Sequence, residues 1–206
     1  GVRSLSAGYM TRIVGVLLAA GRGSRFDPSG ARLKLLEAAM RGGHSGAPLA
    51  VAAARTLRVV LDEVVAVVAP PSEDIQIELH NLLRAEGCTL VVNPRAAEGQ
   101  GTSIACGVGA TSSADGWVIA LADMPAIQPD TVRRVVGALH TGAATVAPAF
   151  RGRRGHPVGF AAPMRSELLA SAGDAGARHV LARHPPQLIE VDDPGVLYDV
   201  DTPGDR

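Results

Sequence analysis

Apolar segments and segments of mixed character alternate along the whole chain. Four apolar runs are nearly free of charge, and each ends at glycine, proline or a polar residue, which is typical of buried parallel strands. They cover residues 13–20, 63–69, 89–92 and 117–122. The segments between them contain apolar residues at helical spacing after proline, serine or glycine, and they predict helices at residues 49–60, 72–86, 103–111 and 129–140.

The second half of the chain continues this alternation with shorter segments. We expect strands at residues 144–149, 158–160, 187–191 and 196–198, helices at 163–170 and 175–184, and a short extended piece at 34–36. The pattern predicts an α/β fold with a single three-layer α/β/α domain and a Rossmann-like, mostly parallel sheet. We assign residues 10–206 to this domain and residues 1–9 to an added or disordered lead outside it.

Composition narrows the classes of function. The 206 residues carry no net charge by formal count, whereas nucleic-acid and membrane-surface binding proteins usually have a basic excess. No apolar run reaches the ~18 residues of a membrane span. Cys88 and Cys106 are the two cysteines, and without CxxC spacing they suggest free thiols in a reducing compartment. We therefore expect a cytoplasmic protein that binds neither nucleic acid nor membrane.

The first strand leads into a turn that contains Gly21, Gly23, Ser24 and Arg25, with Lys34 following after a short gap. Glycines let backbone amides converge on one point, and the two basic side chains would add positive charge, which suits a phosphate. An ordinary strand-to-helix turn with solvated basic residues is the alternative. Two named glycine motifs do not fit, because Phe26 replaces the third small residue of the dinucleotide fingerprint and no Gly-Lys-Ser/Thr follows.

Further candidates follow other predicted strands, so all of them are expected at the same rim of the sheet. Asp123 comes directly after a strand and could hold Mg²⁺ or cap a helix, and Asp201 could complete the metal site or form a turn. Three arginines in residues 151–154 precede His156 and form a local cationic cluster suited to a phosphate monoester. The helix start at residues 99–103 could meet a base or ribose or serve as a plain cap, and Asp174 is expected to cap a helix.

Five motifs in this order resemble the MobA-like nucleotidyltransferases, nearest the molybdenum cofactor cytidylyltransferase branch. They are Leu17-Leu18-Ala19-Ala20-Gly21-Arg22-Gly23-Ser24-Arg25 with Lys34, Ala122-Asp123-Met124-Pro125, Gly155-His156-Pro157, Asp174-Ala175-Gly176-Ala177-Arg178, and Asp199-Val200-Asp201-Thr202-Pro203-Gly204-Asp205. The resemblance implies the fold of the nucleotide-diphospho-sugar transferases. It also implies transfer of CMP from CTP to the phosphate of molybdopterin, with Mg²⁺ and release of pyrophosphate, and it allows for a transient contact with a molybdoenzyme or its chaperone.

The resemblance also implies roles for individual residues. The expected catalytic residues are Arg25, Lys34 and Asp123, and the expected metal ligands are Asp123 and Asp201. The expected acceptor-binding residues are Arg153, Arg154, Gly155 and His156, without proton transfer by His156. The expected nucleotide-binding residues are Leu18, Ala19, Ala20, Gly21, Arg22, Gly23, Ser24, Arg25, Lys34, Asn93, Gly101 and Ser103.

The chain also departs from the family pattern. Phe26-Asp27 stand where Met-Gly is usual, and residues 27–32 and 37–46 are longer than usual. The alanine at position 20 favours CTP, whereas guanylyl members tend to have glycine there. The alternatives are a guanylyltransferase, a sugar-phosphate nucleotidyltransferase of the same fold, or a nucleotide-binding protein without turnover. A dehydrogenase is disfavoured by the missing third glycine.

Overall fold

The computed structural model describes residues 11–205. The expected lead at residues 1–9 therefore lies outside the described residues. Within them, no helix is both long enough and apolar enough to cross a membrane.

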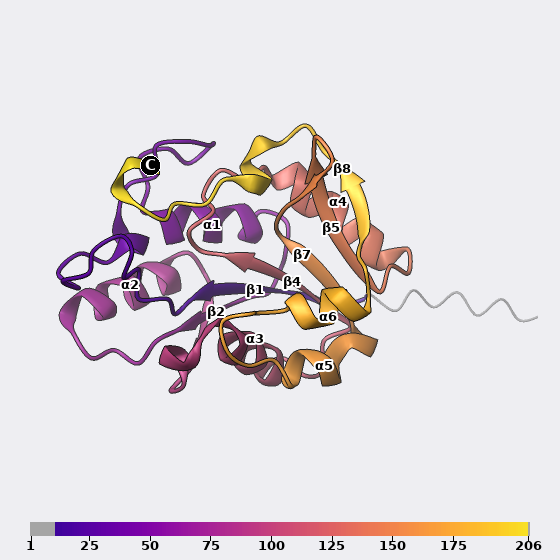
Figure 1. The fold of residues 1–206 in the computed structure, drawn as a ribbon, viewed down its shortest axis with the longest axis horizontal. Coiled ribbons are helices and arrows are strands. Elements are labelled where there is room, and N and C mark those ends of the chain that lie inside the picture. The colour runs from indigo at the N-terminus through magenta and orange to yellow at the C-terminus, as the bar shows by residue number, and fades with distance from the viewer. Residues whose placement is uncertain (1–10, 206) are drawn as a thin grey trace, which may run out of the picture.

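A central sheet of mostly parallel strands organises the domain, so the fold class predicted from the sequence is confirmed (Figure 1). Its parallel half has the order β3-β2-β1-β4, and its second half is mixed, because β7 pairs antiparallel with β4 and with β5. The short β6 and the parallel β8 both pair with β5. The strands are β1 (Ile13–Ala19), β2 (Val64–Val68), β3 (Thr89–Val92), β4 (Gly116–Leu121), β5 (Thr145–Phe150), β6 (Arg153–Arg154), β7 (Val158–Ala161) and β8 (Gln187–Glu190).

Helices cover both faces of this sheet, with α1 and α4 on one side and α3, α5 and α6 on the other (Figure 1). Side chains of β1 alternate between the two resulting cores: Leu17 belongs to the core that includes α1, α2 and α4, and Val16 to the core with α3. This alternation is the two-residue period of a strand buried on both faces. The helices are α1 (Leu49–Arg58), α2 (Asp74–Ala85), α3 (Gln100–Ala110), α4 (Pro129–His140), α5 (Arg165–Leu169) and α6 (Arg178–Arg183).

The order of strands fixes where a ligand can bind. From β1 the chain continues outward to β2 and β3, and it then returns to the other side of β1 as β4. Such a reversal leaves a crevice beyond the carboxyl ends of the two strands, the usual ligand site of open α/β sheets. The turn that begins at Ala20 follows β1, and Asp123 follows β4, so both border this crevice.

Three local predictions are wrong. Residues 34–36, expected to be extended, form the 3-10 turn Lys34–Leu36 instead. The strand expected at residues 196–198 overlaps the 3-10 turn Pro194–Leu197. Proline suits the first position of a helical turn, and the Asp193 carboxylate accepts a hydrogen bond from the amide of Gly195, which stabilises the second turn. Asp174 is not a helix cap, because α6 begins only at Arg178 and the residue preceding it is Ala177.

Candidate active site

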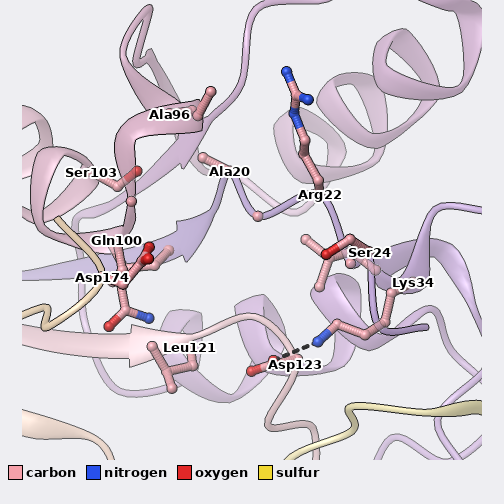
Figure 2. Close-up of a pocket in the computed structure, with 16 residues that line it drawn as sticks. Ala20, Arg22, Ser24, Lys34, Ala96, Gln100, Ser103, Leu121, Asp123 and Asp174 are labelled. Carbon is pink, nitrogen blue, oxygen red and sulfur yellow. Dashed lines mark hydrogen bonds and ion pairs between the residues drawn. The ribbon is translucent and has the colours of Figure 1, made fainter. Parts of the chain in front are cut away.

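The carboxyl ends of β1 and β4 open into a depression with two adjoining lobes of about 360 and 780 Å³. The smaller lobe lies between the turn after β1 and the start of α3 (Figure 2). The larger lobe extends toward β7, α6 and the C-terminal segment. Both lobes share the lining residues Leu18, Ser24, Gln100, Leu121, Asp123 and Asp174, so they form one continuous site.

The turn after β1 presents unpaired backbone donors to the smaller lobe. Gly23 has φ +64°, a conformation that glycine adopts without strain. Its carbonyl accepts hydrogen bonds from the amides of Phe26 and Asp27, at 2.9 and 3.1 Å. Within residues 11–205, the amides of residues 21–25 find no hydrogen-bond partner. Successive free amides in a glycine-containing turn form a concavity suited to an anion.

Four charged side chains form an ionic network at the floor of the depression. Lys34 Nζ lies 2.8 Å from the Asp123 carboxylate and 3.7 Å from that of Asp201, and Arg25 pairs with Asp201 at 3.2 Å (Figure 2 shows the first of these). Lys34 is only 9% exposed, because the 3-10 turn at Lys34–Leu36 directs it inward from beneath Gly23. The structure thus brings together both expected cationic residues and both expected metal ligands.

Two further titratable groups border this network. Partial burial raises the pKa of Asp199, and the carboxylates of Asp201 and Asp123 raise it further. Burial lowers the pKa of His156, against the opposing influence of Asp123, so the imidazole is neutral near pH 7. His156 therefore faces the larger lobe as an uncharged hydrogen-bonding group.

The opposite wall of the smaller lobe is closed by the protein itself. The backbone of residues 172–174 crosses the start of α3 so closely that a Cβ on Gly101 would lie 2.5 Å from backbone atoms of Ala172. The amide of Gly101 donates to the carbonyl of Gly173 at 2.8 Å, so this donor is already used. Gly101 does not line the depression, and its lack of a side chain serves this close packing.

Asn93 also lies behind the wall rather than on it. It is 2% exposed, and its side-chain amide donates to Thr102 Oγ1 at 2.9 Å and to Ser103 Oγ at 3.0 Å. Its carbonyl oxygen accepts from the amide of Arg95. Ser103 itself lines the smaller lobe, and among the described residues its hydroxyl donates to no partner. Asn93 therefore holds Ser103 with the hydroxyl hydrogen available to a ligand.

The arginines after β5 separate into two groups. Successive residues of a strand point to opposite faces, and of the β6 pair only Arg154 lines the larger lobe. Arg153 is exposed and is not part of the lining. Arg178, at the start of α6, lines the same lobe as Arg154. Gly155 borders the lobe as well, but a Cβ there would lie 2.2 Å from the Val196 carbonyl oxygen, so this glycine is needed by the neighbouring segment.

The profile of the MobA-like NTP transferase domain matches residues 15–188, and thus most of the chain. The chain belongs to this family. Nicotine blue oxidoreductase of Paenarthrobacter nicotinovorans is similar in sequence: it is 32% identical over 199 residues, which cover 92% of each chain.

Solved structures resemble this MobA-like protein over nearly its whole length. Rv0371c from Mycobacterium tuberculosis H37Rv has a TM-score of 0.74 at 25% identity, with 95% of both chains covered. The same protein in complex with manganese has a TM-score of 0.73 at 24% identity, covering 95% of this chain and 96% of that one. A nucleotidyl transferase from Methanothermobacter thermautotroptrophicus has a TM-score of 0.73 at 23% identity, with 94% of both covered.

Phe26 and Asp27, which follow the loop arginine, have structural roles here. Phe26 is 5% exposed and packs in a small core with Leu49 and Val200, while Arg32 stacks on its outer face. The Asp27 carboxylate accepts hydrogen bonds from the amides of Ser29 and Arg32, and the Ser29 hydroxyl bond lowers its pKa most. The loop at residues 27–32 is therefore held by its own hydrogen bonds, outside the lining of the depression.

Several lining residues of this MobA-like site were not predicted from the sequence. Gln100 and Asp174 border both lobes, and Figure 2 shows them beside Ser103, opposite Ser24 and Lys34. A polar residue in the first turn of α3 was a usable signal for Gln100. Asp174 has a signal in the motif at residues 174–178, but its position there predicts a helix cap; the packing of residues 172–174 against α3 instead places it in the lining. Ala96, Ala97 and Leu121 complete the smaller lobe, whereas the expected Ala19 is 2% exposed and lies outside its lining.

Proposed function

We propose that this protein transfers CMP from CTP to the phosphate of molybdopterin and releases pyrophosphate. The observation that carries nucleotidyl transfer is the row of unpaired amides at residues 21–25, which lies beside Lys34, Arg25 and two carboxylates at the reversal point of the sheet. Membership of an NTP transferase family supports the same reaction class.

The proposed reaction needs positioning and charge stabilisation more than proton transfer. An oxygen of the acceptor phosphate attacks the α-phosphorus, the bond from that phosphorus to the bridging oxygen breaks, and pyrophosphate leaves with the electron pair. The acceptor is already anionic, so no strong base is required. The amides of residues 21–25 and the Arg25 guanidinium would bind the departing phosphates, and Lys34 would bind the α-phosphate.

A divalent cation fits the carboxylates that the depression presents. Within residues 11–205 no group of three or more acidic, histidine or cysteine side chains is arranged to hold a metal. Mg²⁺, however, typically takes one or two carboxylates together with substrate phosphates and water. Asp123 and Asp201 converge on the same ammonium group, so they are close enough to share one cation. When bound, the metal would neutralise charge that develops on the phosphates.

The ionic network implies an exchange of partners on substrate binding. Lys34 now neutralises Asp123 at 2.8 Å, and Arg25 neutralises Asp201 at 3.2 Å. A triphosphate offers both cationic side chains new anionic partners, which frees the carboxylates to accept a cation. We therefore expect metal binding to depend on nucleotide. The Lys34→Met variant should bind Mn²⁺ without nucleotide, as followed by electron paramagnetic resonance, whereas the unmodified protein should bind it only with CTP.

The nucleobase is proposed to lie against Ala20 and Ser103. The Ser103 hydroxyl, held by Asn93, can donate to an acceptor on the base edge. The methyl group of Ala20 narrows the lobe, which favours a pyrimidine over a purine because steric exclusion gives specificity. These two features support CTP over GTP.

The acceptor is proposed to occupy the larger lobe. Its 780 Å³ combine apolar walls with Arg154, Arg178 and the neutral His156, which suits a flat, phosphorylated ring system. Arg154 can form paired hydrogen bonds with a phosphate, and His156 can hold a polar ring atom. A sugar phosphate has the same anchor group and is the competing acceptor.

The decisive experiment supplies the purified protein with Mg²⁺, each NTP and either molybdopterin or sugar phosphates. We expect pyrophosphate and a cytosine dinucleotide from CTP and molybdopterin. Transfer to a sugar phosphate would overturn the assignment of the acceptor, and faster turnover with GTP would overturn the assignment of the nucleotide.

The 32% identical relative is named an oxidoreductase. A parallel assay with NADH or NADPH and nicotine blue therefore tests that class: turnover there, without pyrophosphate release, would overturn the proposed function.

The arginine pair of β6 offers a matched control for the acceptor site. Arg154→Ala should raise the KM for the acceptor about tenfold or more, the usual consequence of losing a charge-assisted contact, and should leave the KM for CTP unchanged. Arg153→Ala removes an equal charge one residue away but outside the lining, and should change neither KM. Equal effects of both variants would indicate long-range attraction and no specific contact.

A further inference from the structure

A second cavity of about 480 Å³ lies apart from the depression. It is enclosed by the loop at residues 41–44, the start of α4 and the segment that ends at Tyr198. Its lining shares no residue with either lobe of the depression. One wall belongs to residues 41–44, which lie in the segment 37–46. The cavity is therefore separate from the depression to which we assign nucleotidyl transfer.

One side of this cavity is cationic and rich in donors. In the described part of the chain, the Arg41 guanidinium has no carboxylate partner. It stacks on the Tyr198 ring, with 4.8 Å between Cζ and the ring centroid. The His44 side chain has no hydrogen-bond partner within the same residues, nor have the backbone amides of residues 41–44. Gly42 has φ +93°, which turns the loop back onto Ala126 and holds these donors beside the cavity.

The other side of the cavity is apolar. Ile127 and Pro129 form its floor, and two buried polar groups beside them are already satisfied. Asp193 accepts hydrogen bonds from the amides of Gln128 and Gly195 and from Thr131, and Thr56 donates to backbone carbonyls of Ala52 and Ile127. The buried Asp193 and Thr56 are therefore not available to a ligand, whereas the loop at residues 41–44 offers several donors and a positive charge.

We propose that this cavity is a second small-molecule site that binds an aromatic or heteroaromatic phosphate monoester. The ring would lie on Ile127 and Pro129, and the phosphate would lie at Arg41 and His44. A planar guanidinium together with backbone amides matches the several oxygens of a phosphate. An apolar wall with a few convergent polar groups at one end is the general form of a small-molecule pocket.

The position of the cavity suits an effector site rather than a part of the substrate site. The segment from Gly195 to Tyr198 borders the cavity, and it continues directly into Asp199 and Asp201 of the depression. Two backbone hydrogen bonds tie it to the active site, from the amide of His156 to the Val196 carbonyl and from the amide of Val200 to the Asp123 carbonyl. An occupant would thus contact the same segment that carries active-site carboxylates while leaving the substrate lobes open.

The test uses phenyl phosphate as probe and amide NMR shifts as the readout, so it does not depend on turnover. We expect saturable shifts at residues 42–44, Ile127 and Gly195, with weaker binding of inorganic phosphate, which lacks the ring, and of phenol, which lacks the charge. Saturating CTP with Mg²⁺ should not displace the probe. Failure of the proposed nucleotidyl transfer would leave these expectations unchanged.

Two variants and two matched controls locate the probe. Arg41→Gln should weaken binding about tenfold or more, whereas Arg151→Gln removes another arginine stacked on an aromatic ring, at 5.1 Å, and should have no effect. Gly43→Leu should obstruct the cavity, because Gly43 belongs to its lining and a Cβ there meets no atom within 4 Å, so the variant should still fold. Gly137→Leu places the same side chain in equally open space on α4, and it should leave binding of the probe unchanged.

Three outcomes would overturn the proposal. The first is no saturable binding of phenyl phosphate. The second is binding that Arg41→Gln and Gly43→Leu leave unchanged. The third is probe binding that shifts the amides of residues 21–25 and is displaced by CTP, since this would place the probe in the nucleotide lobe.

Discussion

Gly21 lines one wall of the depression and Gly101 lies behind the opposite wall, and a methyl group added to each would meet very different surroundings. At Gly21 no atom lies within 4 Å, and the neighbouring amides are free. At Gly101 three backbone atoms of Ala172 lie at 2.5 Å, and the amide is bound to Gly173. One glycine turn leaves its backbone open to a ligand, and the other lets the chain pack on itself. The comparison shows that two glycine-rich turns that look alike in sequence can have opposite roles.

The largest expected effect tests the open wall. Lys34→Met should reduce kcat about a hundredfold or more. The variant lacks the positive charge proposed to stabilise the negative charge that develops on the transferred phosphate in the transition state. Steady-state kinetics by pyrophosphate release would measure it. Arg32→Gln is the control, because Arg32 belongs to the same loop but pairs with Glu37 and stacks on Phe26. A Lys34→Met variant with near-normal kcat would remove Lys34 from the mechanism.

The next effect tests the closed wall. Gly101→Ala should destabilise the protein by about 3 kcal/mol, because the new methyl group overlaps backbone that cannot move independently. Urea unfolding followed by circular dichroism would give the free energy. If Gly101→Ala unfolded like the unmodified protein but lost nucleotide binding, the closed wall would be a ligand surface after all.

A smaller loss of stability is expected behind that wall. Asn93→Ala should cost about 2 kcal/mol, because Ser103, Thr102 and the amide of Arg95 lose a buried partner. It should also raise the KM for CTP by misplacing the Ser103 hydroxyl. Ser103→Ala separates the two contributions: it should raise that KM while changing the unfolding free energy less. Equal KM values for Asn93→Ala and the unmodified protein would show that Asn93 only supports the fold.

The smallest expected effect on stability belongs to Gly21→Ala. Its free energy of unfolding should stay within about 0.5 kcal/mol of the unmodified value, because the methyl group enters open space. The Kd for CTP should nevertheless rise, since Gly21 lines the lobe where the triphosphate is proposed to bind. Calorimetry of CTP binding beside thermal unfolding would measure both quantities. A fall in stability comparable to that of Gly101→Ala would erase the contrast between the two walls.

The regular part of the fold could be predicted from the sequence because its signals are local. The observed bounds lie within one residue of the predicted ones for the apolar strands β1, β2 and β4 and for helix α4, which begins at a proline. The short turns could not be predicted in the same way. The three residues Lys34–Leu36 are too few to show a period, and they form a 3-10 turn in which Lys34 packs against Gly23.

The sequence by itself indicated that the turn after β1 and Asp123 after β4 share one rim of the sheet, because parallel strands bring their carboxyl ends to one edge. Tertiary structure alone decided which of the candidates face the depression. Asn93 and Gly101 turn out to support the wall, Arg153 points away, and Gln100 and Asp174 border both lobes. The physical reason is that these positions depend on contacts between segments far apart in the chain, such as residues 172–174 on α3, which no local pattern encodes.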